Sequence, residues 1–185
     1  MPKIIANARE DILRTATDCL FENGYGGLAI RDVAARCGMA AGTLYNYFPS
    51  KLDLVSHIIL CEWVESLKRL DAALADAPNC SAGLRCVFEA LSRFSGRFRP
   101  VWEDSRLSPE ALSGHPRGGG HRAQLHLQLS ERLRDLFRRQ KHPELAEGFL
   151  ADFLVRNLLH YSMEPDFDYD VIAPLLQQLL EKEDL

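Results

Sequence analysis

The residue types best suited to chemistry lie together in the stretch GTLYNYFPSK, which ends at Lys51. Its polar groups include the hydroxyls of Thr43, Tyr45 and Tyr47, the side-chain amide of Asn46 and the ammonium group of Lys51. Hydroxyl and ammonium groups suit phosphate oxygens, and an amide suits the edge of a base. The chemistry that this stretch indicates is therefore recognition of nucleic acid in the major groove.

A helix from about Ala41 to Phe48 would present these groups on one side. Leu44 and Phe48 are one turn apart and are expected to face inward. At about 100° per residue, Gly42 and Asn46 point almost opposite Leu44. The outward face is then free to meet DNA. The competing interpretation is an ordinary helical hairpin within an all-α core.

A shorter helix must precede this one. Apolar side chains recur at the i, i+3, i+4 and i+7 positions between Ile30 and Cys37, which is typical of a helix with one buried face. Gly38 follows where the chain needs a residue that tolerates positive φ, so the helix is expected to end there. The two helices form a helix-turn-helix.

The run IRDVAARCGMAAGTLYNYFPSK, together with Gly24-Tyr25, resembles the helix-turn-helix of the TetR (tetracycline-repressor-like) family of bacterial regulators. The resemblance covers roughly Ile5 to Leu54. It implies an all-α fold, with a three-helix DNA-binding head over residues 1–51 and a helical-bundle body for effector binding and dimerisation over residues 52–185. Family members commonly carry Thr or Ser near positions 28 and 29, where the hydroxyl caps the helix and touches a phosphate. This chain has Leu28 and Ala29 instead, which puts both the cap and the phosphate contact in doubt.

The resemblance also implies a set of DNA contacts. Thr43, Tyr47 and Lys51 are expected to hold phosphates. Asn46 suits adenine and Arg31 suits guanine, whereas small residues on the outward face of the helix allow its backbone to come close to the bases. The full expected set is Arg31, Ala41, Gly42, Thr43, Tyr45, Asn46, Tyr47 and Lys51.

Two members of that set have competing interpretations. Tyr45 is expected to touch phosphate or stack, but an aromatic residue here could instead be half-buried packing. Arg31 could pair with Asp32, or hold a phosphate, instead of reading a base. Since few strong base-edge donors remain, specificity is expected to depend partly on DNA shape.

Periodicity and capping signals predict further helices along the chain. Helices are expected at about 7–24, 50–74, 81–98, 102–112, 121–140, 144–163 and 171–182, with a glycine-rich loop at 113–120. The first should begin with an Asn7/Glu10 capping box and the second with a Ser50/Asp53 capping box. The third should be capped by Ser81 and ended by Arg99-Pro100. The helix over 50–74 should carry a stripe that includes Cys61. The arginines late in 121–140 indicate a solvated helix end, or alternatively a second nucleic-acid patch.

By resemblance, the body binds a small-molecule inducer and pairs with a second copy through its last two helices. An aromatic set could line the effector pocket, although residues at helical spacing are more often plain core: Phe88, Phe94, Phe98, Trp102, Phe153 and Tyr161. The expected dimer interface contains Leu154, Leu158, Leu175, Leu176 and Leu179. Two symmetric heads would read a palindromic operator.

Composition agrees with this interpretation. The chain of 185 residues has a net charge of −4. Residues 1–51 carry six basic and five acidic residues, whereas 142–185 carry two basic and ten acidic ones, so the second end should avoid DNA. Five cysteines without paired metal spacing indicate reduced thiols. Without a signal peptide or a bilayer-spanning run, a soluble cytoplasmic protein with no membrane partner is expected.

No catalytic pattern stands out, so the chain is not expected to be an enzyme, and neither a cofactor nor a metal site is expected. His121 and His126 are five residues apart, and with His115 and His160 they do not form a compact ligand set. Two function classes remain: a dimeric ligand-responsive DNA-binding regulator, and a helical small-molecule-binding protein or enzyme that does not bind DNA.

Overall fold

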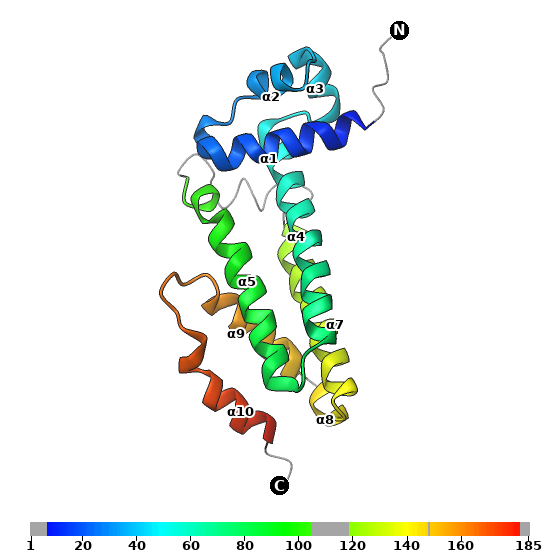
Figure 1. Cartoon of the computed structure of the whole chain (residues 1–185), viewed down its shortest axis with the longest axis vertical. Coiled ribbons are helices and arrows are strands. Elements are labelled where there is room, and N and C mark those ends of the chain that lie inside the picture. Colours follow the sequence, from blue (N-terminus) through cyan, green and yellow to red (C-terminus); the bar gives the residue numbers. More distant parts are fainter. Residues whose placement is uncertain (1–6, 105–118, 148, 182–185) are drawn as a thin grey trace. The chain divides into compact units, whose positions relative to one another are not determined.

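The structure is a computed structural model that describes residues 7–104, 119–147 and 149–181. In that part of the chain the regular elements are helices, as an all-α fold requires (Figure 1). They are α1 (Ala8–Gly27), α2 (Ile30–Arg36), α3 (Ala41–Tyr47), α4 (Lys51–Ala75), α5 (Cys80–Trp102), α7 (Gly119–Arg139), α8 (Pro143–Ala146), α9 (Leu150–Tyr161), the short 3-10 helix η1 (Tyr169–Val171) and α10 (Ala173–Glu181).

The chain divides into two compact units, Met1–Trp63 with Phe98–Gly118 and Val64–Arg97 with Gly119–Leu185. These limits differ from a boundary between residues 51 and 52, because the first unit also takes the start of α4 and the end of α5. Leu54 and Ile58 of α4 are wholly buried. The ring of Phe98 lies 5.4 Å from that of Phe21 in α1. Packing therefore makes both segments part of the unit that holds the helix-turn-helix.

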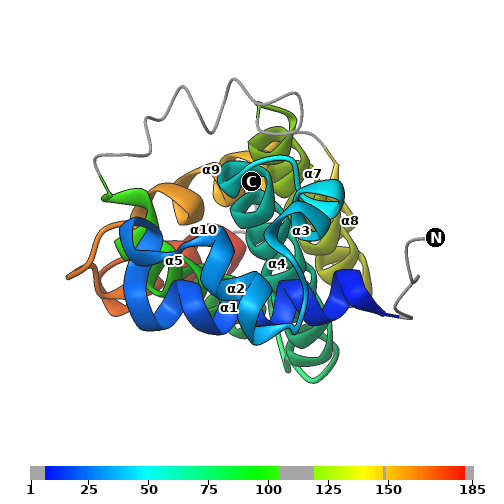
Figure 2. The same cartoon turned by 90° about the horizontal axis from the view of Figure 1, so that it is seen from above.

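The first unit is built on α1, against which α2 packs, while α2 also packs against α3 (Figure 2). Ile12, Ala16 and Leu20 form the predicted buried stripe of α1. Gly24 takes φ 68° and ψ 176°, so helical geometry is interrupted at the residue where the helix was predicted to end. One more turn follows to Gly27, which places the end of α1 slightly later than predicted.

The two predicted capping boxes have different outcomes. Asn7 takes φ 67° and its side chain makes no capping hydrogen bond, so the first prediction was wrong. Its backbone carbonyl accepts the N–H groups of Glu10 and Asp11 instead, both at 3.0 Å. At α4, Ser50 Oγ accepts the N–H of Asp53 at 3.0 Å, as predicted for that side of the box.

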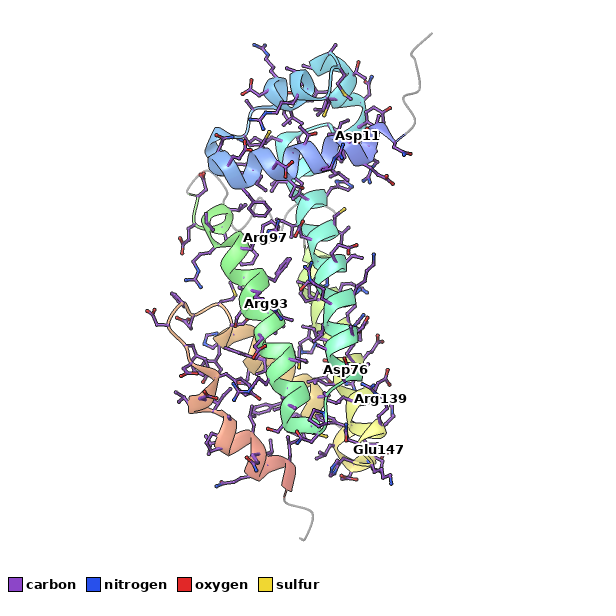
Figure 3. The ribbon with its side chains drawn as sticks, viewed as in Figure 1. Asp11, Asp76, Arg93, Arg97, Arg139 and Glu147 are labelled. Carbon is purple, nitrogen blue, oxygen red and sulfur yellow. The ribbon has the colours of Figure 1, made fainter. Side chains whose placement is uncertain are left out.

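In the second unit α7 packs against α8 and α9. The arginines late in α7 are used within this unit. Arg132 donates to both carboxylate oxygens of Asp71, at 2.6 and 3.0 Å. Arg139, labelled at the lower end of α7 in Figure 3, donates to the carbonyl of Leu74 at 3.3 Å. These contacts favour a structural role for the basic segment over a second nucleic-acid patch.

Several predicted helix limits were wrong. Pro100 does not end α5, which continues to Trp102, since a proline so near the end removes only one hydrogen bond. Asn79 caps α5 in place of Ser81, and its Oδ1 accepts the N–H of Ala82 at 2.8 Å. Cys61 is exposed and lies off the buried stripe of α4.

The remaining differences concern the second half of the chain. The helix predicted over 144–163 is two helices, α8 and α9. α7 begins at Gly119, inside the predicted loop, while residues 105–118 of that loop and of the helix predicted over 102–112 lie outside the described residues. Ahead of α10, Asp168 accepts the N–H of Asp170 at 2.9 Å and caps η1.

Two glycines of α5 provide a matched stability test. A Cβ at Gly83 would lie 2.2 Å from Cδ2 of Leu136, a wholly buried side chain, whereas one at Gly96 would meet nothing within 4 Å. Gly83→Ala is expected to destabilise the fold by about 1–3 kcal/mol through overpacking, although alanine favours the helix. Gly96→Ala should stabilise it by up to about 1 kcal/mol through helix propensity.

Urea unfolding followed by circular dichroism measures both effects. Equal stability of the Gly83→Ala variant and the wild-type chain would mean that α5 and α7 are less closely packed than described.

Candidate nucleic-acid interface

α3 is held from behind by two wholly buried side chains, Leu44 and Phe48. The turn before it is fixed by backbone hydrogen bonds, from Gly38 N–H to the carbonyl of Ala35 and from Met39 N–H to that of Ala34, both at 3.0 Å. Gly38 has φ 66°, which L side chains rarely adopt, so the predicted glycine stop is confirmed. The orientation of α3 is therefore determined by burial and by the turn.

The outward face of α3 carries the polar groups that the sequence pattern places there. Gly42 and Asn46 are exposed, and Tyr45 exposes 47 % of its surface. Ala41, Thr43 and Tyr47 are half-buried and flank the exposed face. These residues lie together on one surface, and Tyr45 is more exposed than a packing role would require.

Arg31 lies on the exposed side of α2. Two other arginines of the first unit form ion pairs, Arg14 with Asp11 at 2.8 Å and Arg36 with Glu22 at 3.0 Å. No ion pair between Arg31 and Asp32 forms within the described residues. The guanidinium of Arg31 is thus available for an external acceptor.

Lys51, at the first position of α4, is held by the last turn of α1, which follows the break in helical geometry at Gly24. Its Nζ lies 4.4 Å from the centroid of the Tyr25 ring and donates to the carbonyl of Gly26 at 3.5 Å. The N–H of Gly26 in turn donates to Oδ2 of Asp104 at 3.0 Å. Burial, and then the charge of Asp104, raise the pKa of Tyr25. The ammonium group therefore has a defined position beside α3.

Sequence reasoning assigned no role to Gly26 or Asp104. Asp104 lies 78 residues from Gly26 and carries no local motif, so nothing in the sequence indicates this contact. Tyr25 was part of the recognised signature, but its contact with Lys51 depends on the fold of the last turn of α1. The absence of a cap at Ala29, by contrast, agrees with the expectation from residue type.

The six aromatic residues expected at an effector pocket do not share one environment. Phe98 is wholly buried and Trp102 stacks on it at 6.1 Å, both within the first unit. Phe88 and Phe94 are buried in the second unit, whereas Phe153 exposes 48 % of its surface. The sixth, Tyr161, stacks on Phe167 at 4.4 Å in the second unit.

A hollow of about 530 Å³ lies elsewhere in the second unit. None of the six aromatic residues lines it. Its lining consists of Asn79, Cys80, Ser81, Ala82, Arg85, His142, Gln177 and Leu180.

The residues expected at a dimer interface also differ from one another. Leu154 and Leu158 each expose only 1 % of their surface, because they pack inside the unit. On α10, Leu175 and Leu179 are exposed and Leu176 is half-buried. Further exposed apolar side chains of the last elements are Phe149, Phe153, Met163 and Val171.

An all-α chain that presents the second helix of a helix-turn-helix outward belongs to the class of helix-turn-helix DNA-binding proteins. Residues 12–58 match the family model described as "Bacterial regulatory proteins, tetR family". The N-terminal helix-turn-helix of the chain is therefore similar to that of TetR-family regulators.

The related sequences include a transcriptional repressor and a nucleoid occlusion factor. The HTH-type transcriptional repressor KstR of Mycolicibacterium smegmatis is 29% identical over 105 residues, which are 57% of this chain and 48% of that protein. The match thus spans about half the length of KstR. The nucleoid occlusion factor SlmA of Salmonella newport is 26% identical over 193 residues, with 95% of this chain and 96% of that protein covered.

Solved structures share the fold. FadR from Bacillus subtilis, in complex with stearoyl-CoA, is 14% identical with a TM-score of 0.60 over 95% of this chain and 99% of that one. A TetR/AcrR-family regulator from Thermobifida fusca is 20% identical with a TM-score of 0.60 over 96% and 98%. Within the described residues, no helix is both long and apolar enough to cross a membrane.

Proposed function

We propose that this chain is a ligand-responsive transcriptional regulator, a dimeric repressor that binds a palindromic operator through α3. The observation that carries the proposal is the division of α3 into two faces. Leu44 and Phe48 are wholly buried, while Gly42, Tyr45 and Asn46 are exposed on the opposite side. A seven-residue helix with this division offers its small and polar groups to a major groove.

In this proposal the contacts divide by chemistry. Thr43, Tyr47 and Lys51 bind phosphates and set the register of the helix. Asn46 reads adenine and Arg31 reads guanine, while Gly42 and its neighbour Ala41 allow the backbone to come close. Tyr45 makes a phosphate or stacking contact.

A single α3 makes few base contacts, and each good one gives about 1–3 kcal/mol of discrimination. Two copies on successive half-sites double that discrimination, which supports a homodimer. The exposed side chains of Leu175 and Leu179 on α10 are the apolar surface that such a dimer would cover. Since the partner is chromosomal DNA, the protein would act in the cytoplasm.

The effector is proposed to be a small molecule that binds the second unit and releases DNA. The FadR structure with stearoyl-CoA shows that one protein of this fold binds an acyl-CoA. Release requires that the ligand bind one conformation more tightly than the other. Buried aromatic side chains, among them Phe88 and Phe94, supply apolar surface suited to such a ligand.

The proposal is tested by selecting duplex DNA from a random library with the purified chain. Wild-type protein should enrich an inverted repeat, and its affinity should fall steeply as KCl rises. Lys51→Ala should weaken binding and reduce the slope of log K against log salt by about 0.9 for each phosphate that the protein no longer neutralises, or about 2 for a dimer.

Lys68→Ala is the matched control, because Lys68 lies on the same helix, is exposed and pairs with Glu65 at 2.7 Å. It should leave the affinity and the slope unchanged. If wild-type protein enriches no sequence, or if the two variants behave alike, the chain does not bind DNA through this surface.

A further inference from the structure

Both backbone polar groups of Gly26 form hydrogen bonds with distant side chains. Its N–H donates to Oδ2 of Asp104 at 3.0 Å, and its carbonyl accepts from Nζ of Lys51 at 3.5 Å. The preceding side chain, Tyr25, places its ring 4.4 Å from the same Nζ. One residue, Gly26, therefore joins an acidic residue that follows α5 to the cation that begins α4.

Gly26 lies in the last turn of α1, from Tyr25 to Gly27, which we call the Gly26 loop. A break in helical geometry at Gly24 separates this loop from the rest of α1. Gly24 leaves helical angles at φ 68° and ψ 176°, and its carbonyl accepts the N–H of Leu28 at 3.1 Å. The loop therefore depends on contacts beyond α1 for its position. Asp104 provides one such contact.

Asp104 itself has a defined place in the first unit. The end of α5 is fixed against α1 by the rings of Phe98 and Phe21, 5.4 Å apart, and by the stacking of Trp102 on Phe98. The N–H of Glu103 donates to the carbonyl of Arg99 at 2.9 Å, so helical hydrogen bonding extends to the residue before Asp104. A carboxylate in this place can hold a neighbouring loop.

We propose that Asp104 is a positioning residue for DNA binding, which acts through the backbone of Gly26 to hold Lys51 ready for a backbone phosphate. The proposal rests on the proposed function, since it needs Lys51 to contact DNA. Asp104 fixes the loop, and the loop supplies the carbonyl and the aromatic ring that restrain the ammonium group. A side chain restrained in advance loses less conformational freedom when it binds.

Simple electrostatics predicts the opposite effect for the same residue. A carboxylate near a DNA-facing surface repels phosphates, so removal of its charge alone should strengthen binding. The hydrogen bond and the charge can be separated by two substitutions. Asp104→Ala removes both, whereas Asp104→Asn removes the charge and keeps a side-chain oxygen that can accept the N–H of Gly26.

The experiment measures DNA affinity and its salt slope for Asp104→Ala, Asp104→Asn, Lys51→Ala and the double variant Asp104→Ala/Lys51→Ala, using the inverted repeat selected by wild-type protein. Asp104→Ala should bind about 5- to 20-fold more weakly, with a smaller salt slope. Asp104→Asn should bind as tightly as wild type or more tightly. In the Lys51→Ala background, Asp104→Ala should have no further effect.

Three results would overturn the inference: wild-type affinity in Asp104→Ala, an equal loss in Asp104→Asn, or an undiminished loss when Lys51 is already absent. Thermal unfolding of each variant shows whether Asp104→Ala weakens DNA binding only because it destabilises the fold. Such a loss of affinity would also occur in the Lys51→Ala background, and it would count against the inference. If wild-type protein binds no DNA, the proposed function fails instead.

Discussion

Gly42→Glu is expected to abolish operator binding, by at least about 100-fold, while the protein remains folded. Gly42 is exposed on α3, and a Cβ there would meet nothing within 4 Å. Its φ is not positive, since the glycines with positive φ in the described residues are Gly24 and Gly38. The fold therefore has no steric reason to require glycine at this position.

The substitution should even favour the helix. Glutamate is a better helix former than glycine by several tenths of a kcal/mol, and a negative charge at the second position of α3 suits the positive end of its dipole. The loss of binding would arise from the surface alone. Bulk would keep the backbone away from the groove, and a carboxylate would face phosphates and base acceptors.

Gly42→Gln is the matched control, because it has nearly the same volume and no charge. It should bind more weakly than wild type but more tightly than Gly42→Glu, and its thermal midpoint should match. Affinity is measured by fluorescence anisotropy with the selected DNA. If the Gly42→Glu variant binds DNA with an affinity within threefold of that of the wild type, α3 does not enter a groove.

The helix-turn-helix could be predicted in detail because its signals are local. The spacing that buries Leu44 and Phe48, and the positive φ at Gly38, depend on residues fewer than ten positions apart. The same local pattern also orients Gly42 and Asn46 outward. Each of these choices agrees with the others, so the sequence defines one arrangement.

What could not be predicted depends on contacts that are distant in sequence. The bond from Gly26 to Asp104 and the ion pair of Arg132 with Asp71 span 78 and 61 residues. Helical periodicity identifies a buried face, but it does not say which element covers that face. The capping prediction at Asn7 failed for a different reason, since this residue takes positive φ instead of the extended conformation typical of a capping residue.

The same limit explains the interface prediction. Leu154 and Leu158 share a helical face with other leucines, and sequence alone could not separate core from subunit contact. Each exposes 1 % of its surface and so packs inside the unit, whereas Leu175 exposes 66 %. On α9 the exposed apolar residues are instead Phe153 and, just before the helix, Phe149.

Leu175→Glu is accordingly expected to break the proposed dimer and, with it, DNA binding. A charge placed at the centre of an apolar interface costs several kcal/mol in each subunit unless it is paired, and symmetry would place two such charges together. The dimer dissociation constant should rise by at least about 100-fold. Binding of each head alone should leave only weak affinity for a half-site.

Sedimentation velocity across a concentration series measures the dissociation constant, and Leu60→Glu is the control because Leu60 is an exposed apolar residue of α4 in the first unit. That variant should remain dimeric and bind the operator. Leu158→Ala provides the opposite contrast: it should lower the stability of the fold by about 2–5 kcal/mol, since it leaves a cavity in the core of the unit. If the Leu175→Glu variant stays dimeric at the concentrations at which the wild-type protein is dimeric, the subunit contact lies away from α10. Another surface would then have to hold the two heads one helical turn apart.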